Sequence, residues 1–299
     1  MTEFDDIVVG KSSVPALAAL VYDCHEFTVG TVNRSRLNAF LVRTYERFLM
    51  KKCRVSIVAT DTIADIVTDA YKLRERPTVA LNTPFYWKLG DAAAAQTRSD
   101  LCSRFGMPED TFLVVCHGKI SQTRGVETLV EASAKTENTS VLILGNGPED
   151  HIAHLKQRCA ELGVADRVFF MPAVPNAELW KYLSACDAGI ITLVPWIQNS
   201  YLSLPNKLFE DIQAMIPVIS SDLPYIAKII KEYDIGLLYE PENPDRLAEA
   251  IERLRTDKEL YTRFRKNLET AKNRLCWEQE KTKLADALTC VAAELAARK

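Results

Sequence analysis

The sequence predicts an α/β protein with two doubly wound, Rossmann-like parallel sheets, the first of them incomplete. From residue 111 onward, short apolar runs alternate with longer amphipathic runs. The apolar runs are rich in β-branched residues and nearly continuous, as in strands that are buried on both faces. The chain has 299 residues, which at about 150 residues per domain leaves room for two compact units.

Six strands and six helices are predicted between residues 111 and 256. Their alternation is typical of a doubly wound domain, in which ligands bind at the carboxyl ends of the strands. The loops that follow the strands are therefore the places to search for functional residues. The predicted strands are 111–116, 140–144, 167–171, 188–193, 217–220 and 236–239, and the predicted helices are 126–135, 149–162, 176–184, 206–215, 223–232 and 244–256.

The first hundred residues predict about half of another doubly wound sheet. The small, polar segment 90–104 is interpreted as a linker that enters a helix, and we divide the chain into domains 1–95 and 96–276. A last helix over 277–298 carries a single apolar stripe. The predicted strands are 6–9, 18–22, 55–59 and 77–81, the predicted helices are 34–50 and 61–70, and the stripe consists of Leu284, Leu288, Val291 and Leu295.

The composition is that of a globular protein and excludes several functions. Hydrophobic residues make up 47% of the chain and charged residues 26%, and a net charge of -3 provides no general attraction for nucleic acid. The eight cysteines include no C-x-x-C pair, which favours buried free thiols in a reducing compartment. The opening residues are acidic, unlike a signal peptide, and no run approaches the ~20 apolar residues of a membrane span. We therefore expect a cytoplasmic protein.

The segment Gly118–Gly125, which follows the first of these strands, is the first candidate site. Its two glycines allow a sharp turn close to a ligand, and Lys119 and Arg124 supply two cations. The next helix directs its positive end to the same loop, so the combination suits a diphosphate. The alternative is an ordinary strand-to-helix turn with two solvated cations, because the segment matches neither a Walker sequence nor G-x-G-x-x-G.

A second candidate site opens the helix that follows the fourth of these strands. Pro205 suits a first helical turn, and Ser203 can cap it. Asn206 and Lys207 then lie at the amino end, where helices bind anions. Glu210 lies one turn further along the same face and can accept hydrogen bonds from ribose hydroxyls. The alternative is a capped amphipathic helix with an exposed lysine and an exposed glutamate.

Two further turns carry candidate residues. Gly145 begins the flexible turn Gly145–Pro148 at the ligand-binding edge of the sheet, where it either contacts a ligand or is only a structural turn. His25 follows a strand of the first domain and stands near Asp23 and Glu26. It is either a catalytic histidine or a structural one.

The other histidines do not have the spacing of metal ligands. His117 stands at a strand end beside the first candidate loop, whereas His151 and His154 are predicted on a helix surface. The sequence also contains no G-x-S-x-G nucleophile elbow. We therefore expect neither a metal ion nor a bound cofactor.

Together these segments resemble the retaining GT-B glycosyltransferases of family 4. The run GKISQTRGVETLVEA resembles the donor-phosphate loop of that family, G-R-L-x-x-x-K-G, with its helix, and LILGNGPED is similar to its G-x-G-P turn. The run SLPNKLFEDIQAMIPVISSD resembles its most recognisable block. The resemblance covers about 111–256 and continues more weakly to the terminal segment 277–299, which in this family often returns to the first domain. It implies a GT-B-like fold.

The resemblance also implies roles for the candidate residues. Lys119 stands where the family has arginine, and Arg124 stands where it has lysine. Both would neutralise the donor diphosphate and stabilise the leaving group as the glycosidic bond breaks. Glu210 matches the second glutamate of the E-x7-E motif of the family and would contact the ribose.

The remaining candidates match donor-side and acceptor-side positions of the family. Asn206 and Lys207 stand where a helix terminus approaches the phosphates and the sugar, and Gly118 and Gly145 stand in the donor-binding turns. His25, in the run YDCHE, matches the first-domain histidine that contacts the transferred sugar.

The sequence departs from the family pattern in two places. Leu202 stands where the family has the first glutamate of E-x7-E, so the carboxylate expected for the hydroxyls of the donor sugar is absent. The first domain also lacks the opening strands and loops that help to build the acceptor site in the family.

The segment 34–54 is basic and amphipathic, with Glu46 as its acid. A helix of this kind either lies on an anionic membrane, where lipid-linked acceptors are found, or covers the first sheet with its cations in solvent. Its cations are Arg34, Arg36, Arg43, Arg47, Lys51, Lys52 and Arg54, and its apolar stripe is Leu37, Leu41, Tyr45 and Phe48.

These observations indicate a glycosyltransferase that moves a sugar from a UDP- or GDP-sugar to a glycan or lipid-linked acceptor in cell-surface polysaccharide or glycoconjugate biosynthesis. We expect retention of configuration, no metal, and a cytoplasmic location that includes the inner membrane face if 34–54 binds lipid. One alternative is a non-catalytic nucleotide-sugar-binding half that completes or regulates a partner glycosyltransferase, as a separate subunit or in a homodimer. Another is a sugar-nucleotide epimerase of related architecture.

Overall fold

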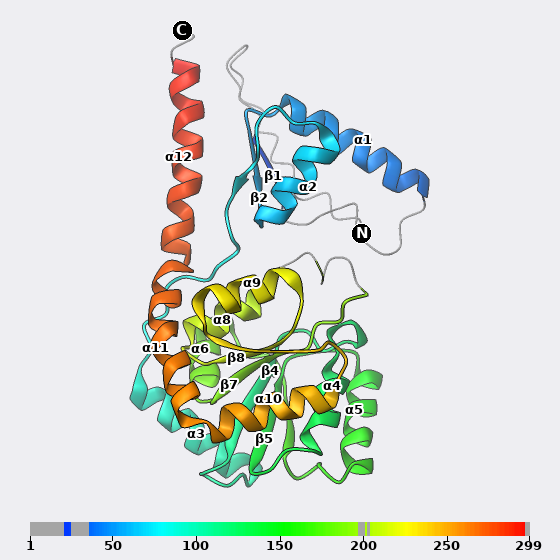
Figure 1. The fold of residues 1–299 in the computed structure, drawn as a ribbon, viewed down its shortest axis with the longest axis vertical. Coiled ribbons are helices and arrows are strands. Elements are labelled where there is room, and N and C mark those ends of the chain that lie inside the picture. Colours follow the sequence, from blue (N-terminus) through cyan, green and yellow to red (C-terminus); the bar gives the residue numbers. More distant parts are fainter. Residues whose placement is uncertain (1–20, 25–35, 197–200, 202–203, 297–299) are drawn as a thin grey trace. The chain divides into compact units, whose positions relative to one another are not determined.

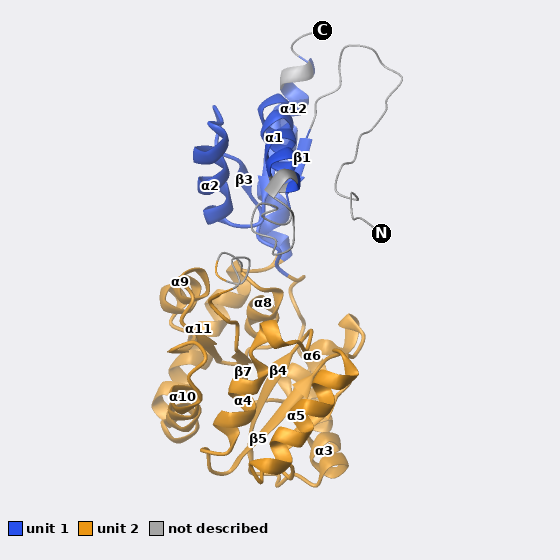
Figure 2. Ribbon diagram, turned by 90° about the vertical axis from the view of Figure 1, so that its right-hand side faces the viewer, with its two compact units in different colours: residues 1–83, 277–299 blue, residues 84–276 orange. Residues whose placement is uncertain are grey.

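The structure, a computed structural model, describes residues 21–24, 36–196, 201 and 204–296. The chain divides into two compact units (Figure 2). The first unit comprises residues 1–83 and 277–299, and the second comprises residues 84–276. The predicted boundary between residues 95 and 96 falls within a helix of the second unit.

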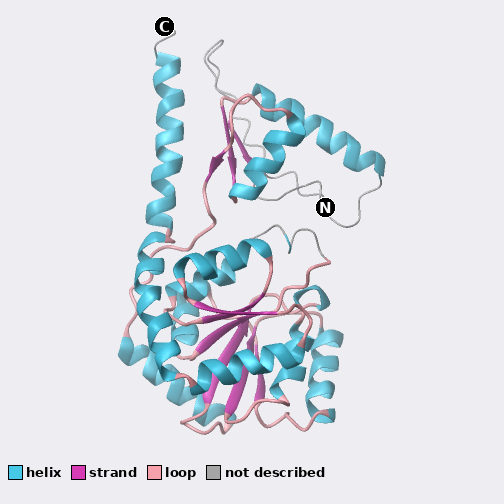
Figure 3. Cartoon of the chain, viewed as in Figure 1, coloured by secondary structure: helices cyan, strands magenta, loops and turns pink. Residues whose placement is uncertain are grey.

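The second unit is built on a parallel sheet (Figures 1 and 3). Its strand order is β6-β5-β4-β7-β8-β9. The chain starts in the middle of this sheet and proceeds first to one edge and then to the other, as in doubly wound nucleotide-binding sheets. The predicted α/β class is therefore confirmed. The strands are β4 (Phe112–His117), β5 (Thr139–Leu144), β6 (Val168–Met171), β7 (Ala188–Ile191), β8 (Val218–Ser221) and β9 (Gly236–Tyr239).

Helices cover both faces of this sheet. α4, α5 and α10 pack on one face, and α3 and α6 pack on the other. The helices of the second unit are α3 (Asp91–Phe105), α4 (Val126–Ser133), α5 (Glu149–Glu161), α6 (Asn176–Ser184), α8 (Asn206–Gln213), α9 (Pro224–Tyr233), α10 (Pro244–Thr256) and α11 (Lys258–Arg274), with a short 3-10 helix η2 (Gln122–Arg124).

The side chains of β4 alternate between two buried clusters. Leu113 and Val115 pack with α3 and α6, whereas Val114 and Cys116 pack with α4, α5 and α10. All four are buried, and each aliphatic side chain of this kind contributes about 1.5–3 kcal/mol through burial. Because both faces of the strand are covered, its sequence is one continuous apolar run.

The six strands predicted between residues 111 and 239 are all present, with bounds displaced by one or two residues at most. The interpretation of 90–104 as a linker was wrong, since α3 spans Asp91–Phe105. Its alanine-rich start favours a helix, but Leu101 and Cys102 are its buried residues and provide little apolar periodicity. The helix α11 was not predicted.

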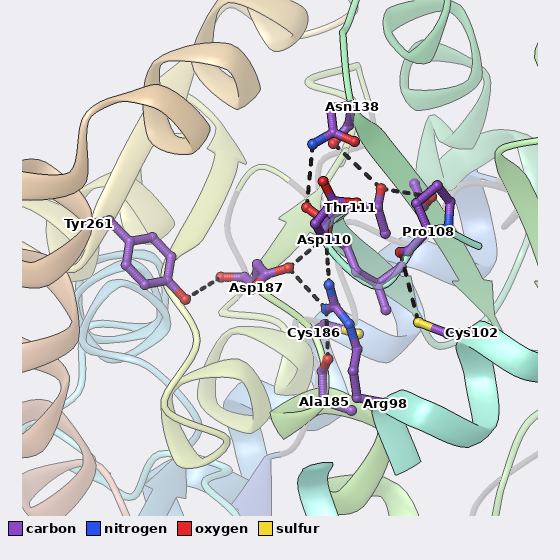
Figure 4. A network of polar contacts seen from close by, with 12 residues as sticks. Arg98, Cys102, Pro108, Asp110, Thr111, Asn138, Ala185, Cys186, Asp187 and Tyr261 are labelled. Atoms are coloured by element: carbon purple, nitrogen blue, oxygen red, sulfur yellow. Dashed lines mark hydrogen bonds and ion pairs between the residues drawn. The ribbon is translucent and has the colours of Figure 1, made fainter. Parts of the chain in front are cut away.

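Arg98 on α3 joins the amino ends of β4 and β7 (Figure 4). Its guanidinium donates hydrogen bonds to the carbonyl oxygens of Ala185 (3.0 Å) and Thr111 and to the carboxylate of Asp187 (3.0 Å). The backbone N–H of Leu113 donates to the same carboxylate at 2.7 Å. The network lies where these strands begin, at the edge opposite their carboxyl ends, so it fixes α3 and the sheet without reaching the candidate loops.

Gln213, at the end of α8, binds the backbone near both places where the chain leaves the second unit. Its Oε1 accepts a hydrogen bond from the N–H of Trp87 at 3.0 Å. Its Nε2 donates to the carbonyl oxygens of Lys272 (2.8 Å) and Leu275 (3.1 Å). The side chain is fully buried, so α8 is held to both segments by a satisfied polar group.

In the described part of the first unit, three parallel strands pair in the order β1-β2-β3, and α12 packs against β2 and β3. The predicted strand 6–9 and the start of the predicted strand 18–22 lie outside the described residues. No helix in the described ranges is long and apolar enough to cross a membrane. The elements are β1 (Val21–Cys24), β2 (Val55–Val58), β3 (Thr78–Val79), α1 (Arg36–Lys52), α2 (Asp61–Tyr71) and α12 (Trp277–Ala296).

The helix α1 presents an acidic side chain to the interior of the first unit. Glu46 is buried, and its carboxylate accepts hydrogen bonds from the hydroxyls of Tyr22 (3.0 Å) and Tyr71 (2.5 Å). Burial, followed by the neighbouring acidic groups, raises the pKa of both tyrosines, so both remain protonated donors. The opposite face of α1 carries Tyr45 and Phe48, which are 54% and 57% exposed.

Candidate functional site

The candidate site lies at the carboxyl ends of β4 and β7 (Figure 1). These strands are neighbours in the sheet, with Val114 opposite Ala188, but the chain leaves them toward opposite edges. Loops that diverge in this way open a crevice, which is the usual ligand position in such sheets. The two candidate segments predicted from the sequence follow these two strands, so they begin at the same point.

The first loop is locked against the end of β7. Gly125 has a φ of 61°, and a Cβ atom on it would lie 2.3 Å from the carbonyl oxygen of Thr192. The hydroxyl of Thr192 donates a hydrogen bond to the carbonyl oxygen of Arg124 at 2.6 Å. Glycine is therefore required at residue 125 both for its left-handed conformation and for this close approach.

The turn that begins at Gly145 supports the first loop from beneath. A Cβ atom on Gly145 would lie 1.8 Å from the carbonyl oxygen of Gly118, and one on Gly147 would lie 2.2 Å from that of Ile120. Two backbone hydrogen bonds of 2.9 Å, from Gly118 to Leu144 and from Ile120 to Asn146, join the loops. An open hollow of about 600 Å³ lies over them, lined by Gly118, Lys119, Asn146, Gly147, Pro148 and Ala173.

The amino end of α8 meets the first loop. The helix begins at Asn206 after Pro205, and no side chain of a described residue caps it. The amino end of a helix attracts anions. Lys207, in the first turn, is only 8% exposed. Its Cε atom lies 3.9 Å from the position of a Cβ atom built on Gly118. Two segments nearly ninety residues apart in sequence are thus in van der Waals contact.

Three cations are gathered at this end of the sheet. Lys119 is exposed and Arg124 is partly exposed, whereas Lys207 is buried along most of its length. None of the three forms an ion pair with another described residue. The helix dipole of α8 adds about half a positive charge at its amino end. The site therefore attracts anions.

Glu210 lies one turn further along α8 and is partly exposed. Burial raises the pKa of its carboxyl group, and the nearby Asp211 adds to that rise, whereas His117 and Lys207 oppose it. Nδ1 of His117 lies 3.6 Å from Oε2 of Glu210. A carboxylate at this position can accept hydrogen bonds from ligand hydroxyl groups.

His117 and Asp211 form a buried pair that the sequence analysis did not propose as part of a site. Nε2 of His117 lies 3.0 Å from Oδ1 of Asp211, and both side chains are almost fully buried. The sequence signals were a histidine at the carboxyl end of a buried strand and a second carboxylate beside Glu210. Neither signal shows that the two residues meet.

The family of glycosyl transferases group 1 matches residues 100–271. The chain belongs to this family. The lipopolysaccharide core biosynthesis glycosyltransferase LpsD of Rhizobium meliloti is 34% identical over 157 residues, which are 52% of this chain and 43% of LpsD. The alpha-D-kanosaminyltransferase of Streptomyces kanamyceticus is 24% identical over 226 residues, 74% of this chain and 56% of that protein. This group 1 chain spans about half the length of the curated relatives it matches.

Solved structures share the fold of this group 1 chain. HepE of Anabaena, crystallised with UDP and glucose, has a TM-score of 0.74 at 18% identity over 91% of this chain and 72% of HepE. Sucrose-phosphate synthase of Thermosynechococcus elongatus has a TM-score of 0.70 at 19% identity over 92% of this chain and 68% of that protein. The predicted GT-B type of α/β fold is confirmed.

In this group 1 chain, the predicted donor-side residues lie in the loop after β4, in the turn after β5 and in α8. His25 and Leu202 lie outside the described residues. Across the described ranges, no group of three or more His, Cys, Asp and Glu side chains is arranged to hold a metal ion. The donor-side residues are Gly118, Lys119, Arg124, Gly145, Asn206, Lys207 and Glu210.

One prediction about the other histidines of this group 1 chain was wrong. His151 was expected on a helix surface but is 7% exposed, with its Nε2 atom 3.6 Å from Oε1 of Glu127 on α4. The reason is that α5 packs on the sheet beside α4, which covers His151. His154 is exposed, as expected.

Proposed function

We propose that the chain is a glycosyltransferase and that its second unit binds a nucleotide-sugar donor, a UDP- or GDP-sugar. The observation that carries the proposal is the convergence of the Gly118 loop and the amino end of α8 between β4 and β7. The unpaired cations at this point suit a diphosphate in charge and position. The presence of UDP in the HepE crystal structures supports the choice of ligand.

In this proposal, side chains and a helix end stabilise the leaving diphosphate. Negative charge grows on its oxygens as the bond to the sugar breaks, and Lys119, Arg124 and the amino end of α8 stabilise that charge. The acceptor oxygen attacks the face from which the diphosphate leaves, so the configuration of the sugar is retained. A phosphate oxygen takes the proton of the acceptor hydroxyl. The scheme requires neither a metal ion nor a cofactor, because the cations of the chain neutralise the diphosphate.

The other candidate residues complete the donor site in this proposal. Glu210 binds the ribose hydroxyls, Asn206 contacts the phosphates or the sugar, and His25 contacts the transferred sugar. Gly145 supports the loop instead of binding the donor, since its Cα faces the carbonyl oxygen of Gly118.

We further propose a glycan or lipid-linked acceptor, in polysaccharide or glycoconjugate biosynthesis, at the inner face of a membrane. The name of LpsD, which refers to lipopolysaccharide core biosynthesis, supports this class of acceptor. The eight cysteines, which are all free, support a reducing, cytoplasmic location.

The exposed face of α1 supports the membrane contact. Phe40 and Leu41, at 66% and 55% exposed, extend the apolar surface formed by Tyr45 and Phe48. Exposed cations flank this surface, as in helices that lie in the headgroup region of an anionic bilayer. These cations are Arg43, Arg47, Lys51 and Lys52.

The proposed function is tested with the purified full chain and a panel of nucleoside diphosphates and their sugars. Wild type should bind UDP or GDP by calorimetry and release that nucleotide from the donor during transfer or hydrolysis. Lys119→Ala and Arg124→Ala should each weaken nucleotide binding about tenfold or more, because a charge-assisted contact to a phosphate is lost. Lys258→Ala, which removes an exposed cation at the start of α11, is the matched control and should bind normally. Unchanged binding and turnover in both site variants would contradict the proposed clamp.

A donor-binding subunit that completes a partner glycosyltransferase is the second candidate function. The observation that favours it is that all the described donor-side residues lie in the second unit, so binding does not depend on the first. Nucleotide-sugar binding without turnover, followed by turnover when a second polypeptide is added, would select this function. Release of free nucleotide by the chain alone would select the glycosyltransferase and would also exclude an epimerase, which keeps the nucleotide attached to the sugar.

A further inference from the structure

His117 stands between the two carboxylates of α8. Its Nε2 atom is 3.0 Å from Oδ1 of Asp211, and its Nδ1 atom is 3.6 Å from Oε2 of Glu210. The imidazole is 3% exposed, so water does not compete for either nitrogen to any large extent. A residue at the end of β4 is thus placed directly behind the carboxylate that is proposed to bind the donor ribose.

Asp211 is fully buried, and its second oxygen, Oδ2, has no hydrogen-bond partner among the described residues. The carboxylate lies flat against β7, where a Cβ atom on Gly189 would be 2.2 Å from Oδ2. A buried carboxylate with a single partner is unfavourable unless that partner is charged or shares a proton with it. The imidazole of His117 is therefore the group that satisfies Asp211, through its Nε2 atom.

The other ring nitrogen faces Glu210. Nδ1 lies 3.6 Å from Oε2 of Glu210. His117 and Lys207 favour the ionised form of the Glu210 carboxyl group, whereas Asp211 opposes it. Cys186 near Asp211 stays neutral because burial raises the pKa of its thiol. One imidazole thus contacts both carboxylates.

We propose that His117 and Asp211 are positioning residues that hold Glu210 in place for the ribose of the donor. This inference rests on the proposed donor site. Asp211 fixes the imidazole, and the imidazole fixes the Glu210 carboxylate so that its exposed edge accepts the ribose hydroxyls. Without the imidazole, Glu210 loses this contact, so the part of the affinity that comes from the ribose falls.

The test compares UDP with 2′,3′-dideoxy-UDP, which lacks the hydroxyls that Glu210 would bind. If only the guanine nucleotide binds, GDP and its dideoxy analogue replace them. Wild type should prefer UDP to the dideoxy nucleotide about tenfold or more, measured by calorimetry. His117→Gln keeps a donor for Asp211 but has no second ring nitrogen toward Glu210. It should weaken the binding of UDP about tenfold and leave the binding of dideoxy-UDP within about twofold, so that the preference for UDP is lost.

A double-mutant cycle provides the second measurement. Glu210→Gln should lower the affinity for UDP as much as His117→Gln does. The double variant should bind UDP no more weakly than Glu210→Gln alone. Asp211→Asn should reproduce the loss of preference for UDP. Equal losses for UDP and dideoxy-UDP, or additive losses in the double variant, would show that the pair only supports the fold and would overturn the inference.

The wild-type measurement applies even if no variant folds. Equal affinity of wild type for UDP and for the dideoxy nucleotide would overturn the inference while leaving the donor site intact. Wild type that binds neither UDP nor GDP would overturn the proposed function, and this inference with it.

Discussion

At the residue scale, glycines decide how closely the loops of the site approach one another. The Cα atom of Gly145 faces the carbonyl oxygen of Gly118, and the backbone of Gly145 is not left-handed, so steric contact alone requires glycine there. A similar argument applies to Gly189 beneath Asp211. The close packing of the loops thus depends on the absence of a few methyl groups.

Gly145→Ala tests this argument. A Cβ atom 1.8 Å from a carbonyl oxygen forces the two loops apart, which should cost about 1–3 kcal/mol of unfolding free energy and displace the Gly118 loop. Nucleotide affinity should fall together with stability, as measured by denaturant unfolding and calorimetry. Gly90→Ala is the control. Gly90 lies directly before α3, and a Cβ atom there would be at an ordinary distance of 3.7 Å from its nearest neighbour. Normal nucleotide affinity in Gly145→Ala would contradict the support role.

The sequence could predict individual site residues only where a local pattern placed them. Glycines and cations after a strand, or polar residues at a helix start, are visible in a few consecutive residues, and the structure brings the Gly118 loop and Lys207 together. The pair His117 and Asp211 is separated by 94 residues and joins a strand end to a helix. No local pattern encodes such a contact, because it depends on the order of strands in the sheet.

At the element scale, sequence patterns predict best where both sides of an element are buried. The strand β4 contributes to two cores, so its continuous apolar run left little alternative. The alanine-rich helix α3 buries few side chains, so its sequence pattern resembles that of a linker. Arg98 nevertheless anchors this helix to the sheet. The helix α1 has an apolar stripe that pattern analysis cannot orient, because the hydrogen bonds of Glu46 decide which side faces inward.

The exposed face of α1 predicts binding to anionic membranes. Phosphatidylglycerol-containing vesicles should carry the full chain upward in a density gradient, whereas phosphatidylcholine vesicles should not. About 1 M salt should release the chain from the vesicles, because the Debye length is then ~3 Å and the attraction between the cations and the lipid headgroups is screened beyond that distance. Phe48→Ser should reduce binding at least about tenfold, since a buried aromatic side chain contributes about 1.5–3 kcal/mol. Phe85→Ser is the control, an equally apolar residue that is 66% exposed in the second unit. Equal flotation of wild type and Phe48→Ser would contradict membrane contact through α1.

At the scale of the whole molecule, the two units have different kinds of support. The two large apolar clusters of the described residues lie entirely within residues 84–276. The first unit combines segments from both ends of the chain, with α12 packed on its small sheet in the described ranges. The length of the chain predicted two units, but the position of the division depends on which contacts α3 makes, and these are not visible in its sequence.

The second unit should therefore fold and bind nucleotide without the first. A chain limited to residues 84–276 keeps both clusters, every described donor-side residue, and the backbone partners of Gln213 at Trp87 and Leu275. We expect a cooperative thermal transition by circular dichroism and a UDP or GDP affinity within about tenfold of the full chain, a difference of about 1.4 kcal/mol. Sugar transfer should be absent, since the proposed contacts of His25 and the acceptor belong to the first unit. A broad transition without near-ultraviolet signal would mean that the second unit needs the first to fold, whereas retained transfer would place the acceptor site within 84–276.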